Sequence, residues 1–361
     1  MRKVLGGLSL LFAGVVTLRH FLYAKGLFRH HTLGCQVISI GNLTVGGTGK
    51  TPVVEIFARA LQREGRRVAI LSRGYRKVEH RLWKKMLDGI TGRTRRRKPR
   101  VVSNGRELLL DSAMSGDEPY MLASNLRDVV ILVDKDRVKS GRYAIDKAQC
   151  DTLILDDGFQ YLALKHWVEI VLVDCTNPFS NGYMLPRGLL REPIMNINRA
   201  DFIFITKSDG GPKSAELKKM LHGMNPRAEI SECLHKPRHL RNVYSSEQRD
   251  LDYLRGVRIA VVSGIASPVG FEEELRQLGA EIVYCRRFAD HHRYTQQEVI
   301  NLINAALREN AAMIVTTEKD AVRFPKIERK DVPIYFLRVE IQLLSGEEDF
   351  NACIHRICFR A

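Results

Sequence analysis

The feature that most constrains the fold of this chain is the stretch ISIGNLTVGGTGKTPVVEIF at residues 38–57. Three glycines followed by lysine and threonine, between an apolar segment and a helical pattern, are typical of a phosphate-binding loop. The usual pattern G-x-x-x-x-G-K-[ST] begins with glycine, and Thr44 stands at that position here. The remaining glycines still allow backbone N–H groups to turn towards an anion. The stretch therefore predicts a phosphate-binding loop that departs from the usual pattern at one residue.

The predicted loop combines several groups that bind a nucleotide's phosphates. Its backbone N–H groups and the start of the following helix favour an anion, because the helix dipole is positive at that end. Lys50 would reach the terminal phosphates, and the Thr51 hydroxyl would bind magnesium. The predicted nucleotide-binding residues are Thr44, Val45, Gly46, Gly47, Thr48, Gly49, Lys50 and Thr51.

Short segments rich in valine, isoleucine and leucine recur along the chain without alternation of polar and apolar residues. They are residues 35–42, 67–74, 129–136, 152–158, 169–175 and 201–209. Such segments are typical of strands that are buried on both faces of a parallel sheet covered by helices. The predicted fold class is therefore α/β, with a doubly wound, mostly parallel sheet that carries the phosphate-binding loop (P-loop).

The pattern changes in the second half of the chain, which indicates more than one domain. Residues 226–257 are polar and basic without strong periodicity, and a second series of strand and helix patterns follows them. A chain of 361 residues is long enough for two domains. We expect an N-terminal helical segment at 1–34, a P-loop domain at 35–225, a connection at 226–257 and a smaller C-terminal α/β domain at 258–361.

The N-terminus carries an uncharged run from Val4 to Leu18, and the cations Arg19, Lys25 and Arg29 follow it. The run is shorter than the roughly 20 residues that a membrane-spanning helix needs. A signal-peptide core and a soluble helix are alternatives, although no clean A-x-A cleavage site follows the run. We favour a membrane-associated helix whose flanking cations lie at the lipid headgroups. Whether this helix spans the membrane or lies on it stays open.

Lysine and arginine outnumber aspartate and glutamate by 57 to 41, which gives a net charge of +16. Nucleic acid, an acidic membrane surface and a phosphorylated substrate are all compatible partners for such a charge. Residues 80–100 are especially basic, and they form either an exposed loop or a contact with the phosphates of lipid or nucleic acid. The 7 cysteines include no C-x-x-C pair, so neither a zinc ribbon nor a thioredoxin-like site is indicated.

Two adjacent carboxylates, Asp156 and Asp157, end the apolar segment TLILDDG. Next to a P-loop, acidic residues at the end of a strand suit the metal that accompanies a nucleotide. Other polar clusters, each typical of a turn or helix cap when taken alone, are SRGY (72–75), SGDEPYML (115–122), LPRGLLREP (185–193), FADHHRY (288–294) and TTEKDAV (316–322).

Taken in order, these motifs resemble the tetraacyldisaccharide 4'-kinase family, the lipid A kinases of Gram-negative envelopes. The resemblance rests on G-N-x-T-V-G-G-T-G-K-T-P, S-R-G-Y, G-D-E-P, D-D-G-F-Q, L-P-x-G-x-L-R-E-P, D-H-H and T-E-K-D-A-V, which run from residue 41 to residue 322. Thr44 also matches this family, so its P-loop is of a divergent subtype. The resemblance implies transfer of the γ-phosphate of ATP, with Mg²⁺, to the 4'-hydroxyl of a tetraacylated glucosamine disaccharide 1-phosphate.

The resemblance further implies a role for individual residues. Asp117 of G-D-E-P and His291 of D-H-H match the catalytic base and its partner, and such a pair can accept the proton of a sugar hydroxyl. His292 is the alternative to His291, and Lys50 completes the implied catalytic set. The two residues of the pair lie in different predicted domains, so domain closure would bring them together. The implied metal ligands are Thr51, Asp156, Asp157, Gln160 and Glu192, and the implied substrate-binding residues are Arg73, Tyr75 and Arg191.

The implied partners are a lipid A precursor, which is an anionic glycolipid, and the cytoplasmic face of the inner membrane. The chain would be peripheral there or anchored by its N-terminus. We expect a monomer that binds no nucleic acid. Two departures from the family leave its lipid contacts open: Tyr161 stands where the family usually has histidine, and Arg187 where it favours a small residue.

Two rival interpretations are weaker. A P-loop GTPase is suggested by TKSD at 206–209, which is similar to the guanine-reading motif N-K-x-D, but Thr206 replaces the asparagine and the other GTPase motifs are absent. A basic module that binds nucleic acid or membrane, and uses ATP only structurally, would fit the charge. However, no RNA- or DNA-binding motif occurs, and an aromatic content of 7% offers no evident stacking platform.

Overall fold

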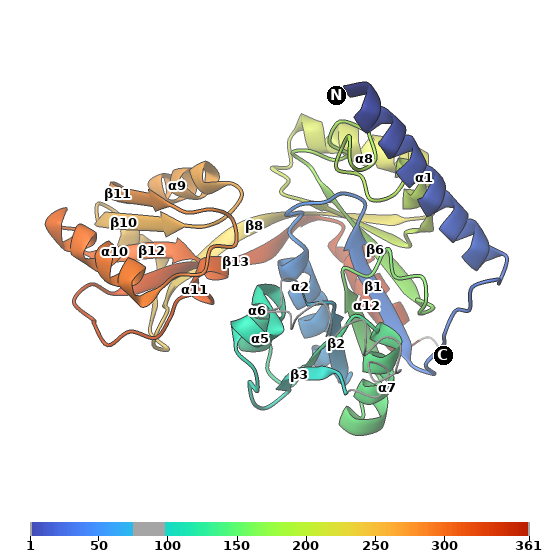
Figure 1. Ribbon diagram of the computed structural model, residues 1–361, viewed down its shortest axis with the longest axis horizontal. Coiled ribbons are helices and arrows are strands. Elements are labelled where there is room, and N and C mark those ends of the chain that lie inside the picture. Colours follow the sequence, from blue (N-terminus) through green and yellow to red (C-terminus); the bar gives the residue numbers. More distant parts are fainter. Residues whose placement is uncertain (1, 75–97, 360–361) are drawn as a thin grey trace. The chain divides into compact units, whose positions relative to one another are not determined.

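The computed structural model describes residues 2–74 and 98–359 (Figure 1). Its internal contacts divide the chain into two compact units. The larger unit contains residues 1–115, 122–235 and 341–361, and the smaller unit contains residues 116–121 and 236–340. Both units are built on parallel strands with helices packed against them.

The sheet of the larger unit has the strand order β8-β7-β6-β1-β5-β2-β4-β3. These strands are β1 (Gln36–Asn42), β2 (Val68–Ser72), β3 (Arg100–Asn104), β4 (Val130–Val133), β5 (Thr152–Asp156), β6 (Val168–Asp174), β7 (Phe202–Thr206) and β8 (Glu229–Asn242). All neighbouring pairs are parallel except β3 and β4. The carboxyl ends of the parallel strands therefore meet along one edge, where sheets of this kind bind their ligands.

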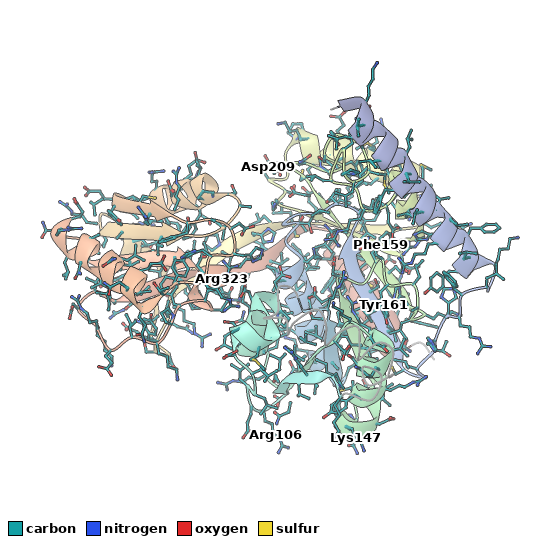
Figure 2. The ribbon with its side chains drawn as sticks, in the orientation of Figure 1. Arg106, Lys147, Phe159, Tyr161, Asp209 and Arg323 are labelled. Carbon is teal, nitrogen blue, oxygen red and sulfur yellow. The ribbon has the colours of Figure 1, made fainter. Side chains whose placement is uncertain are left out.

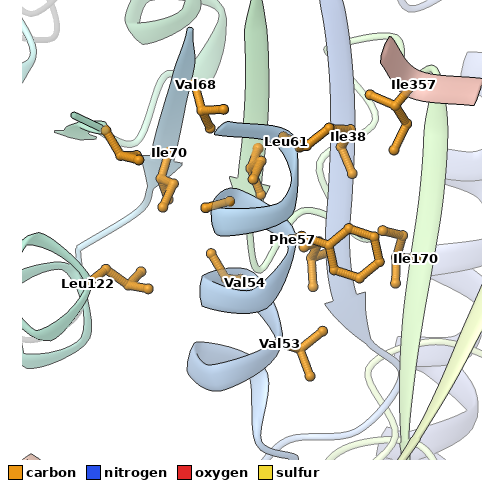
Figure 3. Close-up of a cluster of buried hydrophobic side chains, with 14 of the residues drawn as sticks. Ile38, Val53, Val54, Phe57, Leu61, Val68, Ile70, Leu122, Ile170 and Ile357 are labelled. Carbon is orange, nitrogen blue, oxygen red and sulfur yellow. The ribbon is translucent and has the colours of Figure 1, made fainter. Parts of the chain in front are cut away.

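Helices pack against both faces of this sheet. The helices α2 (Lys50–Arg63) and α12 (Glu347–Phe359) cover the face that carries Ile38 of β1, and Figure 3 shows the core beneath α2. The helix α7 (Arg137–Ala148) covers the other face, against Val37, because successive strand residues point to opposite sides. Further helical segments of the chain are α5 (Ser112–Ser115), α6 (Asp117–Asn125), η1 (Ile194–Arg199) and α8 (Pro212–Met224). The predicted α/β class with a mostly parallel sheet is confirmed.

The smaller unit repeats this arrangement with four strands in the order β11-β10-β12-β13, all parallel. These are β10 (Arg258–Ser263), β11 (Glu281–Arg287), β12 (Met313–Thr317) and β13 (Ile334–Ser345). The helix α9 (Pro268–Gln277) packs on one face of the sheet and α10 (Gln296–Arg308) on the other. Shorter elements of the chain are β9 (Gln248–Arg249), η2 (Leu251–Leu254) and α11 (Glu318–Ala321).

The observed division differs from the predicted one in the second half of the chain. Part of the predicted connection at 226–257 forms the long strand β8, which has buried residues at Ile230 and Leu240. Residues 341–361, expected in the C-terminal domain, belong to the larger unit. The reason is that α12 returns to α2, where the ring of Phe350 lies 4.9 Å from that of Phe57.

A third difference concerns the residues that carry Asp117. The predicted P-loop domain includes them, but residues 116–121 group with the smaller unit. In this division Asp117 and His291 belong to the same unit, whereas the predicted boundaries assign them to different domains. Asp117 also forms ion pairs with basic residues of this unit that lie more than 170 positions away in the sequence.

The N-terminal helix α1 (Arg2–Ala24) extends well beyond the uncharged run that marks it in the sequence. Its 23 residues give a length of about 35 Å, and Lys3–Ala24 is long and apolar enough to cross a membrane. Phe12, Ala13 and Val16 pack against the core of the larger unit. The exposed large apolar residues of α1 are Val4, Leu8, Leu10, Leu11, Val15, Leu18 and Phe21.

Candidate active site

The P-loop lies between the end of β1 and the start of α2, as predicted, and Asn42 holds its two ends together. The Asn42 side chain donates from Nδ2 to the carbonyl of Thr44 at 2.7 Å and accepts at Oδ1 from Lys50 Nζ at 3.3 Å. The backbone of Thr44 forms a β-bridge with Leu190, and the N–H of Val45 donates to the carbonyl of Leu189 at 2.7 Å. The backbone of Thr44 is therefore paired in a short β-bridge and does not have a positive φ. A residue with a side chain can adopt this conformation, so no glycine is needed there.

Two later glycines of the loop are required by the backbone. Gly46 has φ 129° and Gly49 has φ 79°, which side chains rarely adopt. A Cβ on Gly49 would also lie 2.5 Å from the ring of His235 on β8. Residues 45–47 are exposed, whereas Thr48 and Thr51 are buried. The loop therefore presents backbone groups to solvent while its ends are held by the sheet.

The two predicted carboxylates lie at the end of β5, the neighbour of β1: Asp156 is the last residue of the strand and Asp157 follows it. Asp156 is buried and accepts a hydrogen bond from Ser72 Oγ at 3.0 Å. Both carboxylate oxygens of Asp157 accept from Arg191 Nη1 at 2.8 Å, and Oδ1 lies 3.7 Å from Lys50 Nζ. Burial alone would raise the pKa of Asp157, but the charges of Lys50 and Arg191 lower it below its ordinary value. Asp157 is therefore an anion beside the P-loop lysine.

Gln160 joins this group. Its Nε2 donates to the carbonyl of Asn42 at 3.0 Å, and its Oε1 lies 3.4 Å from Arg191 Nη1. Thr51, Asp156 and Asp157 offer the oxygen ligands that magnesium prefers, and this ion is usually held by one or two carboxylates together with phosphates and water. Across the described parts of the chain, 2–74 and 98–359, no group of three or more His, Cys, Asp or Glu residues forms a metal site independent of a nucleotide. The residues present therefore fit a metal that arrives with phosphates.

Glu192, predicted as a further metal ligand, has basic and amide partners. The carboxylate is 1% exposed, and its Oε2 accepts from Arg199 Nη1 at 2.9 Å and from Asn196 Nδ2 at 2.8 Å. His20 of α1 lies 3.4 Å from the same oxygen. This network joins the N-terminal helix to the residues that follow the P-loop carboxylates.

Arg137, at the start of α7, is a buried cation that the sequence analysis did not single out. It is 5% exposed, its guanidinium lies 4.7 Å from the centre of the Tyr161 ring, and its Nε has no hydrogen-bond partner among the described residues. Its backbone N–H donates to the Tyr161 hydroxyl at 3.0 Å. Burial lowers the pKa of Arg137, while Tyr161, Asp156 and Asp157 act in the opposite direction.

The structure brings Asp117 and His291 together in the smaller unit. His291 Nδ1 lies 3.4 Å from Asp117 Oδ2. Arg323, which is labelled in Figure 2, is a member of the same group. It donates from Nε to the same oxygen at 2.8 Å, and its Nη2 lies 3.1 Å from His291 Nδ1. Arg293 contributes a further contact to Asp117 Oδ1 at 3.3 Å. A carboxylate, an imidazole and two guanidinium groups thus form one cluster, which we call the Asp117 cluster.

His292, the alternative partner, points elsewhere. Its Nε2 lies 3.1 Å from Glu298 Oε1, and its ring stacks on Phe288 with 4.5 Å between the ring centres. His291 is therefore the histidine that contacts Asp117.

Of the predicted substrate-binding residues Arg73 and Tyr75, the structure describes only Arg73. Arg73 directly follows β2 and is exposed. Tyr75 lies outside the described residues, and so does most of the basic stretch 80–100. Arg191, the third predicted residue, pairs with Asp157 as described above.

A family model described as "LpxK: Tetraacyldisaccharide-1-P 4'-kinase" matches residues 1–358. The chain belongs to this family. The relatives of this kinase family include a tetraacyldisaccharide 4'-kinase from Anaeromyxobacter dehalogenans (strain 2CP-C), which is 39% identical over 347 residues, or 95% of this chain and 87% of that one.

A second tetraacyldisaccharide 4'-kinase, from Geobacter sulfurreducens, is 39% identical over 334 residues and covers 92% of this chain and 87% of its own. Among solved structures, LpxK from Aquifex aeolicus in complex with ATP has a TM-score of 0.75 and 27% identity, and 99% of each chain is covered. The likeness to this kinase family therefore extends over both units of the fold.

Proposed function

We propose that this chain transfers the γ-phosphate of ATP to the 4'-hydroxyl of a tetraacylated glucosamine disaccharide 1-phosphate, a step of lipid A biosynthesis. Full-length membership of the 4'-kinase family carries the proposal. The P-loop with its adjacent Asp156 and Asp157 supports it independently, because phosphoryl transfer depends on positioning and on charge neutralisation.

On the nucleotide side, Lys50 and the backbone N–H groups of residues 44–51 would hold the phosphates. Lys50 Nζ is already placed between Asn42 and Asp157, at 3.3 and 3.7 Å. Thr51, Asp156 and Asp157 would hold Mg²⁺, with Gln160 and Glu192 as outer members of that group. When bound, the ion would neutralise charge on the β- and γ-phosphates.

On the acceptor side, the Asp117 cluster would take the proton of the 4'-hydroxyl. Nδ1 of His291 faces Asp117, so a proton on Nδ1 can be donated to the carboxylate while Nε2 accepts the proton of the hydroxyl. In the other tautomer, Nδ1 would accept from Arg323 and Nε2 would carry the proton. The balance between Asp117 and Arg323 therefore decides whether His291 is ready to act as a base.

The lipid side of the substrate would be met by cations and by α1. Arg73, Tyr75 and Arg191 would bind the disaccharide and its 1-phosphate. The exposed apolar residues of α1 would hold the chain at the cytoplasmic face of the inner membrane, peripherally or by insertion. The chain would act as a monomer.

The experiment that tests this function is the transfer of labelled γ-phosphate from ATP to a tetraacyldisaccharide 1-phosphate in detergent micelles. Lys50→Ala should abolish labelling of the lipid, since the loop loses the cation that reaches the terminal phosphates. Lys147→Ala, which removes an exposed cation from α7, is the matched control and should label the lipid normally. ATP hydrolysis without labelled lipid would reject the acceptor, and normal transfer by Lys50→Ala would reject the P-loop assignment.

A further inference from the structure

Arg199, the last residue of η1, is a cation of the larger unit to which the proposed function gives no role. Its Nη1 donates to Glu192 Oε2 at 2.9 Å, and its Nη2 donates to Glu169 Oε2 at 3.0 Å. The Arg199 side chain is 24% exposed, whereas those of Glu192 and Glu169 are 1% and 15% exposed. Two largely buried carboxylates therefore fix the place of this guanidinium, which distinguishes it from a surface arginine.

The same guanidinium binds the turn that carries the predicted metal carboxylates. Nη2 also donates to the carbonyl of Phe159 at 2.6 Å, and the guanidinium carbon lies 4.0 Å from the centre of the Phe159 ring. Phe159, which is labelled in Figure 2, is fully buried, and a cation over a buried ring is attracted more strongly than one in water. Arg199 thus contacts both the backbone and the ring of a residue that lies between Asp157 and Gln160.

The turn that contains Phe159 has a conformation that its surroundings must fix. Asp157 has φ 56°, which is uncommon for a residue with a side chain. The N–H of Gly158 donates to the carbonyl of Ile40 at 3.1 Å. A Cβ on Gly41 would lie 2.7 Å from the backbone nitrogen of Phe159, so the turn packs closely on the end of β1, which leads into the P-loop. Such a conformation persists only where neighbouring contacts determine it.

The residues on either side of Phe159 face the P-loop. Asp157 Oδ1 lies 3.7 Å from Lys50 Nζ. Gln160 Nε2 donates to the carbonyl of Asn42 at 3.0 Å. The carbonyl that the guanidinium binds belongs to the peptide group that joins Phe159 to Gln160. A movement of this peptide group would therefore displace Gln160 directly, and it would displace Asp157 through the turn.

The two carboxylates that hold Arg199 have further partners. Glu192 Oε2 also accepts from Asn196 Nδ2 at 2.8 Å. Glu169 Oε1 lies 2.8 Å from Nδ1 of His166, whose side chain is 4% exposed. The guanidinium is therefore held in place independently of the turn, and it can serve as a fixed support for it.

We infer that Arg199 is a positioning residue for phosphoryl transfer. It fixes the carbonyl of Phe159 and thereby sets the side chains of Asp157 and Gln160 beside the P-loop. It acts through this turn and not by contact with the nucleotide or the lipid. This inference rests on the proposed function, because the placement of the turn affects the reaction only if the P-loop holds the phosphates.

The test compares initial rates of lipid phosphorylation by the full chain in micelles for wild type, Arg199→Lys and Arg199→Met. Lysine keeps the charge but lacks the planar fork that reaches both carboxylates and the Phe159 carbonyl. Because a catalytic group misplaced by about 1 Å costs about 100-fold, we expect kcat of both variants to fall by about that factor. KM for ATP and for the lipid should stay within about threefold, since the loss is one of placement in the transition state.

Arg356→Lys is the matched control for a purely structural loss. Arg356 lies on α12 in the same unit and donates from both terminal nitrogens to the carboxylate of Glu229. Glu229 begins β8, so this pair lies at the opposite edge of the sheet from the carboxyl ends of the strands. The control should lose thermal stability, as Arg199→Lys does, but its kcat should stay within about twofold of wild type.

A double variant asks whether Arg199 acts through the turn. In a chain that carries Gln160→Ala, Arg199→Lys should lower kcat by about tenfold instead of about 100-fold, because both changes affect the same group. The inference is overturned if kcat of Arg199→Lys equals that of Arg356→Lys, or if its loss is the same with and without Gln160→Ala. Arg199→Met leaves two buried carboxylates without their cation, and if it does not fold, Arg199→Lys decides alone.

Lys50→Ala separates this inference from the function on which it rests. If Lys50→Ala labels the lipid normally, the P-loop assignment is wrong and the role of Arg199 falls with it. If Lys50→Ala abolishes labelling while Arg199→Lys keeps the kcat of the control, the positioning role alone is wrong and the proposed function stands.

Discussion

Arg323 holds the Asp117 cluster together, and its replacement should separate catalysis from nucleotide binding. The guanidinium is 1% exposed and contacts Asp117 Oδ2 at 2.8 Å, Asp320 Oδ1 at 3.2 Å and His291 Nδ1 at 3.1 Å. Removing one partner of a buried ion pair costs about 3–5 kcal/mol. Asp320 keeps the hydroxyls of Tyr294 and Thr317 as donors, so we expect Arg323→Met to destabilise the chain by roughly 3 kcal/mol, the low end of that range.

The catalytic effect should be larger than the effect on binding. Arg323→Lys keeps the charge but cannot reproduce the planar fork that reaches Asp117, Asp320 and His291 together. We expect kcat to fall by about 100-fold, since a catalytic group misplaced by about 1 Å costs that much, while KM for ATP stays within about twofold. The measurements are initial rates of lipid phosphorylation and thermal unfolding of wild type, Arg323→Lys and Arg323→Met.

Arg329→Lys is the control, because Arg329 pairs with Asp331 on the surface of the same unit. An Arg323→Lys variant with normal kcat would refute the reasoning, because the fork would then have no role in placing His291. A rise in KM for ATP with unchanged kcat would equally refute it.

Three further outcomes test other parts of the structure. Arg191→Met removes a cation that lowers the pKa of Asp157, and a lowered pKa gives stability that is present above the unfolded pKa and lost as pH falls. The variant should therefore be less stable than wild type at pH 7 and should lose less thermal stability than wild type in a series from about pH 7 to pH 3. Equal pH curves would contradict this. Tyr161→Phe removes the hydroxyl that accepts from the N–H of Arg137 and should lower the free energy of unfolding by about 1 kcal/mol. Tyr161→His should restore this stability only if its ring nitrogen accepts from the same N–H. Leu11→Glu, on the exposed face of α1, should reduce partition into anionic vesicles without changing thermal unfolding, and unchanged partition would place the membrane contact elsewhere.

The parts of the fold that local pattern encodes were predictable. The buried strands β1, β2, β4, β5, β6 and β7 each match a segment rich in valine, isoleucine, leucine or phenylalanine, because both faces of a parallel sheet are covered. The P-loop and its two carboxylates were also predictable, since adjacent parallel strands bring their carboxyl ends together.

The parts that depend on distant contacts were not. Arg323 lies one residue beyond the cluster TTEKDAV that the sequence analysis marked, and nothing local says that it meets Asp117. β8 escaped prediction because its pattern mixes buried and exposed positions over 14 residues. Glu192 reads as a metal ligand from its motif, whereas its carboxylate has Arg199 and Asn196 as partners.

The charges around the P-loop bear on the role that we propose for Lys50 in binding a nucleotide. If Lys50 were the only cation beside Asp157, the half-buried carboxylate would be left without a cation whenever Lys50 moved to the phosphates. Such an unpaired charge costs free energy. Arg191 removes this cost, because it contacts both oxygens of Asp157 at 2.8 Å while Lys50 lies farther away at 3.7 Å. In the proposed function Lys50 would therefore exchange Asp157 for the phosphates while Asp157 stays ionised. The same reasoning makes Arg191→Met a variant in which Lys50 stays with Asp157, so its KM for ATP should rise even where kcat is maintained.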